Sequence, residues 1–224
     1  MRQMELDYYK GVLKCEITDR FHSRMPFEET ELWYLLYNLL EAAYLMEPLR
    51  RKIGDLHPKN IVVNEKGRIK VVPSALFPAS PDNYQQIVAD RVSDVFLAPE
   101  ELDEAMIDRG AYPAVNPCRA EVFNIGVTML MAATLRDSYY LYDRKKMRYN
   151  GPKEAEFMEE VRNQYSPYFG DVLNALSPAF TAGSSNFRKD RISSSCLLSS
   201  LKKSLAALRF LGLGSKRALS TSPK

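Results

Sequence analysis

The stretch GDLHPKNIVV, residues 54–63, decides the fold that this sequence predicts. It brings a carboxylate (Asp55), a proline and an amide (Asn60) into a short polar loop before a β-branched run. The turn NEKG follows at 64–67, and a second β-branched run, RIKVV, follows at 68–72. Two such runs around a turn that ends in glycine predict a β-hairpin. We therefore expect Asp55 and Asn60 to point from one loop into one cleft, with the hairpin as their base.

Composition places the chain among ordinary globular proteins with one domain and a tail. Of its 224 residues, 46% are hydrophobic and 26% are charged, and a chain of this length can bury a core. No apolar run approaches the roughly 18 residues that span a bilayer, and residues 1–7 lack the layout of a secretory signal. We therefore expect an intracellular protein, with the cytoplasm as its compartment.

Cysteine and histidine usage argues against two kinds of metal site. The three cysteines are an odd number without paired spacing, which indicates a reducing compartment and argues against a zinc cluster. The two histidines, His22 and His57, lie far apart in the sequence. Metal catalysis by imidazole ligands is therefore not expected.

Positive charge is concentrated at the C-terminal end. Residues 188–224 contain nine Lys or Arg and one Asp, a net charge of +8, whereas the rest of the chain carries −5. A basic tail on a mildly acidic body favours an anionic partner, although a solvated surface is the commoner explanation. No nucleic-acid partner is expected.

Two long apolar segments predict helices of the core. Residues 27–48 begin with acidic side chains, which suit the positive end of a helix dipole, and end at a proline. Their wide apolar face predicts packing in a core rather than contact with a membrane or a cofactor. Residues 120–131 are mostly apolar and predict a helix that is buried all round. Shorter helices are expected at 153–161 and 171–176, and an exposed connection at 136–150.

The polar loop resembles the catalytic loop of the eukaryotic protein kinases, H-R-D-L-x-x-x-N. The resemblance implies that Asp55 holds the position of the base that receives the substrate proton, and that Asn60 holds the position of a magnesium ligand. The sequence departs from the pattern at Ile53 and Gly54, which replace the histidine and the arginine. His57 replaces the lysine that contacts the transferred phosphate in many members.

Other elements resemble the same family in the same order. Residues 6–13 predict the end of an apolar strand that runs into a glycine turn, and they look like the hinge between the two kinase lobes. The resemblance implies that Tyr8 and Tyr9, with Val62 in the hairpin, are remnants of a nucleotide pocket. No glycine-rich loop or strand lysine precedes this hinge in the sequence, so we expect the large, C-terminal lobe of a kinase without the small N-terminal lobe.

Three further positions carry the resemblance and its main defect. Pro73 stands where the family has the aspartate of Asp-Phe-Gly, which removes the main magnesium ligand. Glu100 ends an Ala-Pro-Glu motif, and the resemblance implies that it forms a buried ion pair with Arg191. Glu121 takes the position of an aspartate that, in the family, bonds back to the catalytic loop.

We therefore expect a mainly α fold with a small β-hairpin, covering residues 1–211, and a disordered basic, Ser-rich tail at 212–224. The resemblance implies a pseudokinase: a catalytically impaired kinase-like module that binds protein partners as a regulatory scaffold. No cofactor is expected in that case. The alternative is a truncated serine/threonine-type protein kinase, whose full-length form would use ATP and magnesium to phosphorylate proteins.

The segment before the tail leaves two interpretations open. Residues 195–208 carry leucines at helical spacing, interleaved with Lys202 and Lys203 and followed by Arg209. They could form a basic amphipathic helix on an anionic membrane, or the last helix of the kinase-like lobe with its leucines packed inward. The second is favoured because the Arg191 element immediately precedes it.

Overall fold

The computed structural model describes residues 9–46, 48, 53, 56–64, 69–72, 96–102, 117–143, 146 and 148–176. The regular elements, in chain order, are β1 (Tyr9–Val12), α1 (Leu13–Ser23), α2 (Glu29–Met46), the 3₁₀ turn η2 (Pro58–Asn60), β2 (Ile61–Asn64), β3 (Ile69–Val71), α5 (Pro117–Thr134), the 3₁₀ turn η4 (Ser138–Leu141), β4 (Tyr142–Asp143), β5 (Arg148–Tyr149), α6 (Gly151–Gln164) and α7 (Pro167–Leu176). This is the mainly α fold with a small antiparallel sheet that the sequence predicts.

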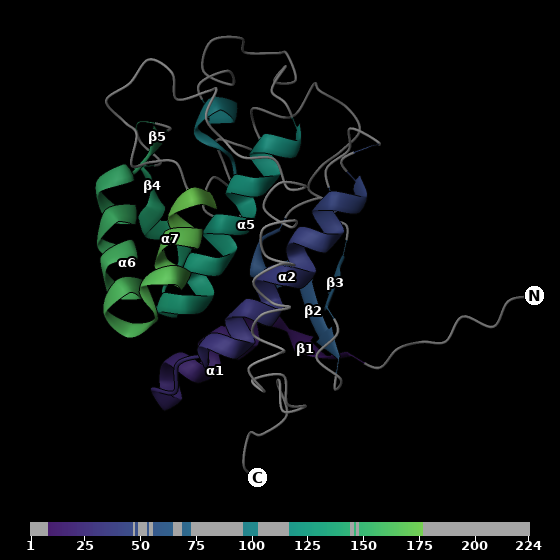
Figure 1. Cartoon of the computed structure of the whole chain (residues 1–224), viewed down its shortest axis with the longest axis vertical. Helices are drawn as coiled ribbons and strands as arrows, with labels where there is room; N and C mark the ends of the chain where they lie inside the picture. The colour runs from purple at the N-terminus through teal and green to yellow at the C-terminus, as the bar shows by residue number, and fades with distance from the viewer. Residues whose placement is uncertain are drawn as a thin grey trace, which may run out of the picture.

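Helix α5 lies at the centre of the arrangement. Figure 1 shows α6 and α7 on one side of it and α2 on the other, with the strands β2 and β3 beyond α2. Every side chain from Ala120 to Thr134 is buried, which confirms the prediction of a helix enclosed on all sides. Gly126 allows close packing there, because a Cβ at this position would lie 3.2 Å from the Cβ of Leu176 in α7.

The small sheet has the order β1-β2-β3, with both pairs antiparallel. The predicted hairpin is present: Ile61 pairs with Val71, and Val63 with Ile69. The prediction of a glycine turn after the first strand was wrong. Gly11 lies within β1 and pairs with Val63, at an irregularity in the register. Glycine is common at such bulges because it adapts to the local twist.

Helix α1 follows β1 directly and was not predicted. Only Leu13 and Ile17 are buried in it, and no side chain caps its first turn, so its sequence signal is short. The helix ends at Arg24, which has a left-handed conformation with φ of 56°.

An ion-pair network joins α1 to the start of α2. The guanidinium of Arg20 donates two hydrogen bonds of 2.9 Å to the carboxylate of Glu31 and one of 2.7 Å to Glu16. Arg20 also lies over the ring of Phe27, 4.0 Å from its centroid. Glu31 in turn accepts a 2.8 Å hydrogen bond from the Glu28 N–H, which satisfies one of the free amides at a helix start.

A second junction ties α2 to the linker between α6 and α7. The carboxylate of Glu29 accepts hydrogen bonds from the N–H and the hydroxyl of Ser166, at 2.8 and 2.7 Å, and from the indole of Trp33, at 3.0 Å. The Tyr165 hydroxyl lies 3.2 Å from the carbonyl oxygens of Phe27 and of Ala133. These bonds fix α7 against the ends of α2 and α5.

The stretch 136–150 is partly buried, so the prediction of an exposed connection was wrong. Ser138, Leu141 and Tyr142 are buried, and β4 pairs with β5 in a short hairpin. The hydroxyl of Tyr142 donates to the carbonyl of Leu97 at 3.1 Å and lies 3.2 Å from the Leu97 N–H, which donates to it. This stretch therefore supports the chain at 96–102. The helices expected at 153–161 and 171–176 are present as parts of α6 and α7.

Candidate functional site

Two side chains of α5 form hydrogen bonds with the main chain of the polar loop. The carboxylate of Glu121 accepts a hydrogen bond of 2.5 Å from the Ile53 N–H, and the hydroxyl of Thr128 donates one of 2.6 Å to the carbonyl of Leu56. Glu121, Thr128 and Leu56 are all buried. The two bonds join α5 to the main chain on both sides of residues 54–55, which are outside the described residues.

The following residues turn tightly into the hairpin. The Lys59 N–H donates to Nδ1 of His57 at 3.2 Å, and the Asn60 N–H donates to the His57 carbonyl at 2.8 Å. The Asn60 carbonyl then accepts a 2.7 Å bond from the Val72 N–H at the end of β3. The backbone of Asn60 is therefore fixed at the open end of the hairpin, where β2 begins and β3 ends.

His57 connects the loop to two distant parts of the chain. Its ring is buried and lies 5.0 Å from the ring of Phe96. The second part is Asp137, because the electrostatic effect of His57 lowers the pKa of its carboxylate. Burial has the largest single effect and acts to raise the pKa of Asp137, but its bond to the Lys14 ammonium, the Tyr139 N–H and the charge of His57 together lower it.

The structure places some of the predicted site residues and leaves others outside the described residues. Asp55, Tyr8, Pro73 and Arg191 lie outside them. The main chain of Tyr9 pairs with Asn64 of β2. Tyr9 therefore lies on the strand next to the one that carries Val62.

Val62 is half-buried, and it pairs with Val12 of β1 and with Lys70 of β3. Asn60 is half-buried one residue before β2. Asn60 thus precedes β2, Val62 lies within it, and the backbone of Tyr9 pairs with its last residue, Asn64.

At the Ala-Pro-Glu motif, residues 98–100, we expected Glu100 to be the buried acid, and the structure buries the next residue, Glu101, instead. Glu100 is half-buried, whereas the next residue, Glu101, is only 3% exposed. The carboxylate of Glu101 accepts a 2.9 Å hydrogen bond from the Ala98 N–H and so caps the first turn of its helix. The expected partner of Glu100, Arg191, lies outside the described residues.

Sequence reasoning missed Thr128, Lys14 and Asp137. Thr128 had a usable signal, because it is a polar residue seven positions after Glu121 in an otherwise apolar helix and therefore lies on the same face. Lys14 and Asp137 are ion-paired beside the loop although 123 residues separate them. No local pattern announces a pair of this kind.

The chemistry available in the described part of the loop is limited to an amide, an imidazole and an ammonium group. Within the described residues, no group of three or more His, Cys, Asp and Glu side chains is placed to hold a metal ion. A surface hollow of about 480 Å³ lies elsewhere, between the ends of α1 and α5 and helix α6, and shares no residue with the loop.

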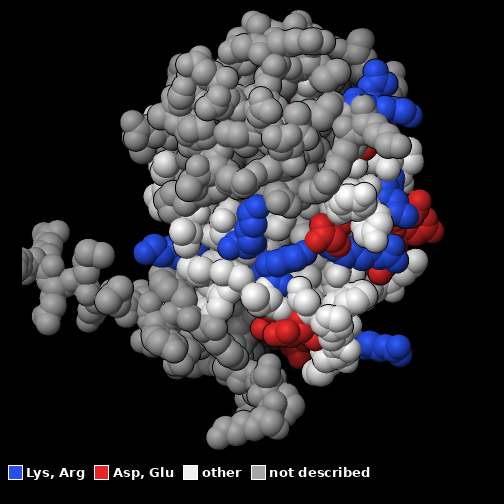
Figure 2. All heavy atoms as spheres, turned by 180° about the vertical axis from the view of Figure 1, so that it is seen from behind, with Lys and Arg blue, Asp and Glu red and all other residues white. Residues whose placement is uncertain are grey.

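Charges on the described surface are mixed. Figure 2 shows Lys and Arg side chains in a band across the described part of one face, with Asp and Glu beside and below it. Pairs such as Lys14–Asp137 and Arg136–Glu160 account for part of this mixture. No helix in the described part of the chain is both long and apolar enough to span a bilayer.

No protein-family model matches the chain, and no curated protein matches it.

Proposed function

We propose that this chain is the large lobe of a protein-kinase-like fold that has lost phosphoryl transfer and acts as a protein-interaction module. The observation that carries the proposal is the attachment of the polar loop to α5. A buried helix offers a carboxylate, Glu121, to the main chain at Ile53, the position that corresponds to the histidine of H-R-D. A hairpin, β2–β3, follows the loop directly.

The arrangement supports a scaffold that positions a loop, and the residues in it argue against catalysis. Phosphoryl transfer depends on metal ions that neutralise the developing charge on the phosphate oxygens. Asn60 offers one amide oxygen, and Pro73 has no oxygen in its side chain to serve as the second ligand. Magnesium sites use carboxylates together with phosphate oxygens, so these two residues do not fit a magnesium site.

The remaining base position does not compensate for this loss. A general base such as Asp55 contributes about 10²–10⁴-fold to a rate, whereas positioning and charge neutralisation supply most of the catalysis in phosphoryl transfer. We therefore assign Asp55 no catalytic role in this chain.

A thermal-shift titration with ATP, with and without magnesium, tests the loss of activity. The wild-type chain is expected to give no magnesium-dependent shift and no incorporation of phosphate into a general protein substrate. Asn60→Ala is the matched control, because it removes the one candidate ligand that lies among the described residues. A magnesium-dependent shift in the wild type that disappears in Asn60→Ala, together with phosphate transfer, would overturn the proposal in favour of an active kinase.

We propose the β3 side of the small sheet for the binding role. In the described sheet β3 is an outer strand, and an outer strand offers unpaired backbone groups that a partner can pair with. Val72 follows β3 directly and is 42% exposed. A partner identified by cross-linking mass spectrometry should bind less tightly to Val72→Lys, and as tightly as before to Thr18→Lys on the exposed side of α1. Equal binding to both variants would contradict this placement of the interface.

A further inference from the structure

The surface hollow of about 480 Å³ lies where three helices end. Its lining comes from the last turn of α1 and the residues after it, from the end of α5, and from the second half of α6. Helix α1 ends at Ser23, α5 at Thr134 and α6 at Gln164. The side chains that line the hollow therefore come from parts of the sequence that lie far apart.

Two residues that line the hollow have a left-handed backbone conformation. Arg24 follows α1 and Leu135 follows α5, each with φ of 56°, and within the described ranges they are the only non-glycine residues with positive φ. Glycine is the usual residue at such a helix end, because a side chain strains this conformation. Residues in strained conformations are concentrated at binding and catalytic sites. Glycine at either position would relieve the strain, and the sequence has instead two large side chains that line one hollow.

The charged groups of the hollow include one cation that lacks an anion. The carboxylate of Glu160 is bound by the guanidinium of Arg136, at 3.0 Å. By contrast, the side chain of Arg24 is exposed and forms no hydrogen bond or ion pair in the part of the chain that the structure describes. A guanidinium presents a planar set of donors that matches a carboxylate. The hollow is therefore complementary to a carboxylate.

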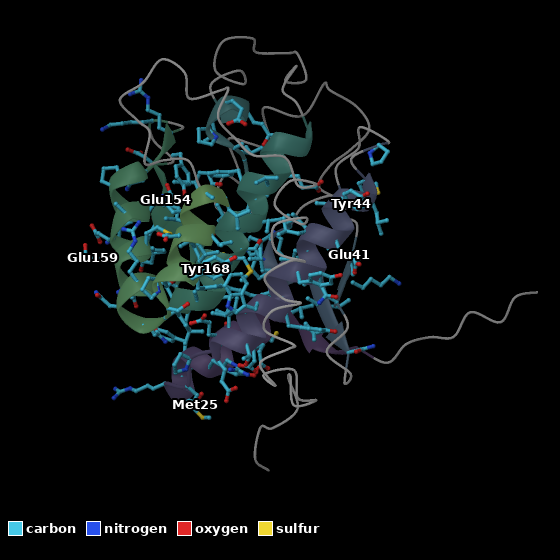
Figure 3. All side chains as sticks on the ribbon, viewed as in Figure 1. Met25, Glu41, Tyr44, Glu154, Glu159 and Tyr168 are labelled. Atoms are coloured by element: carbon cyan, nitrogen blue, oxygen red, sulfur yellow. The ribbon has the colours of Figure 1, made fainter. Side chains whose placement is uncertain are left out.

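Apolar side chains surround this cation and extend beyond the hollow. Phe21 lines the hollow and is 58% exposed, and Met25, next to Arg24 in the chain, is 57% exposed. Figure 3 shows Met25 beyond the end of α1, at the edge of the molecule. Exposed apolar side chains that surround a polar group are typical of a protein interaction site. A small ligand confined to the hollow would leave Met25 in water, so a longer segment fits this surface better.

We propose that the hollow binds a peptide segment of a protein partner that carries a carboxylate next to an aliphatic or aromatic side chain. The carboxylate pairs with the guanidinium of Arg24, and the apolar side chain packs against Phe21 and Leu135. This site does not depend on the proposed function, because the hollow shares no residue with the polar loop or with the β2–β3 hairpin.

Isothermal titration calorimetry of the full chain with three peptides tests the proposal. The first peptide is Gly-Glu-Leu-Glu-Phe-Gly, acetylated and amidated so that only its glutamates are charged. The second has glutamine in place of both glutamates, and the third has serine in place of leucine and phenylalanine. The first is expected to bind, and the other two at least about tenfold more weakly, because each lacks the partner of one half of the site.

Arg24→Gly separates binding from folding, because glycine relieves the left-handed conformation while the guanidinium is removed. The variant should bind the first peptide at least about tenfold more weakly than the wild type, with a Tm equal to or above that of the wild type. Phe21→Ala should weaken binding of the first peptide and leave the weak binding of the third unchanged. The matched controls are Arg148→Gln on β5 and Leu45→Ala on α2, which change exposed side chains outside the hollow and should bind the first peptide as the wild type does.

The proposal is wrong if the first peptide does not bind at millimolar concentration, or if the glutamine peptide binds equally well. It is also wrong if Arg24→Gly binds the first peptide as the wild type does. If the Tm of Arg24→Gly falls together with its affinity, Arg24 supports the fold and the proposal fails. It fails as well if phenylacetate binds as tightly as the first peptide, since the hollow is then a site for a small carboxylate.

Discussion

Replacing Thr128 by valine tests whether α5 holds the polar loop in place. The threonine hydroxyl has one hydrogen to donate. It lies 2.6 Å from the Leu56 carbonyl and 2.9 Å from the Asn124 carbonyl of its own helix. Because the Leu56 oxygen is nearer, we assign the hydrogen to that bond. Valine keeps the shape of threonine, so the substitution removes the donor without opening a cavity.

The expected loss follows from burial at both ends of the bond. Leu56 and Thr128 are each 0% exposed, so water cannot replace the missing donor. An unsatisfied buried carbonyl costs about 1–3 kcal/mol, and we expect Thr128→Val to lower the free energy of unfolding by about 2 kcal/mol. In a protein of this size, that corresponds to a decrease in Tm of about 4–8 °C.

Urea unfolding followed by tryptophan fluorescence measures this loss. The single tryptophan, Trp33, is 6% exposed and stacks on Tyr168, so its emission reports on packing in the core. Thr134→Val is the control: its hydroxyl donates to the Leu130 carbonyl within α5, and the substitution should cost less than about 1 kcal/mol. Equal losses in the two variants, or no loss in Thr128→Val, would refute the reasoning.

Three further substitutions test the junctions around α2. Tyr165→Phe removes a half-buried hydroxyl that is within hydrogen-bond distance of two carbonyls and should cost about 1 kcal/mol. Burial raises the pKa of Tyr165 to about 12 from 10.0. The contribution of the neutral hydroxyl is therefore complete below pH 10.0 and is lost as the pH rises toward 12, so the wild type should lose stability there more steeply than the variant. Glu29→Gln should cost about 1 kcal/mol at neutral pH. Burial acts to raise the pKa of Glu29, but the bonds from Ser166 and the tryptophan indole lower it below 4.5, so the contribution is complete above pH 4.5 and is lost as the pH falls through the lowered pKa. Arg20→Met leaves the buried carboxylate of Glu31 without its guanidinium and should cost about 3 kcal/mol.

Each of these expectations has a contradicting outcome, and Arg20→Met also has a control. The control is Lys153→Met, which breaks an exposed ion pair with Glu156 and should lower the free energy of unfolding by less than about 0.5 kcal/mol. If Arg20→Met lowers it no more than Lys153→Met does, the ion-pair network of Arg20 does not have the role assigned to it. The Tyr165 prediction is wrong if wild type and variant have the same stability profile above pH 10.0. For Glu29, the contradicting result is an acid unfolding curve of Glu29→Gln that superimposes on that of the wild type.

The secondary-structure elements that have a clear pattern in their own sequence could be predicted. The hairpin follows from two β-branched runs around a glycine turn. Helix α2 follows from apolar periodicity, and α5 from the mostly apolar run at 120–131. Helix α1 could not, because two buried residues, Leu13 and Ile17, give too short a pattern. The burial of Tyr142 was also out of reach, since its partner Leu97 is 45 residues away.

For the candidate site, the sequence indicated the loop, and the family resemblance pointed to Glu121 as the residue that bonds to it. The structure adds the Glu121–Ile53 bond and the contacts around it. The contact of His57 with Phe96 and the pair formed by Lys14 and Asp137 depend on how distant segments pack. Glu101 was overlooked because two adjacent acids have the same local pattern, and only the geometry of the helix start decides which of them is buried.

The enclosure of α5 has a consequence for hydrogen exchange. Its amide protons can reach solvent only when the helices packed around it separate, so no local opening of a single turn is sufficient. Amides between Ala120 and Ala133 should therefore exchange with deuterium more slowly than those of α1, and at a rate set by global unfolding. A substitution on α2, α6 or α7, the helices that pack against α5, will then accelerate exchange at the centre of α5 if it lowers overall stability, even where it touches no atom of that helix.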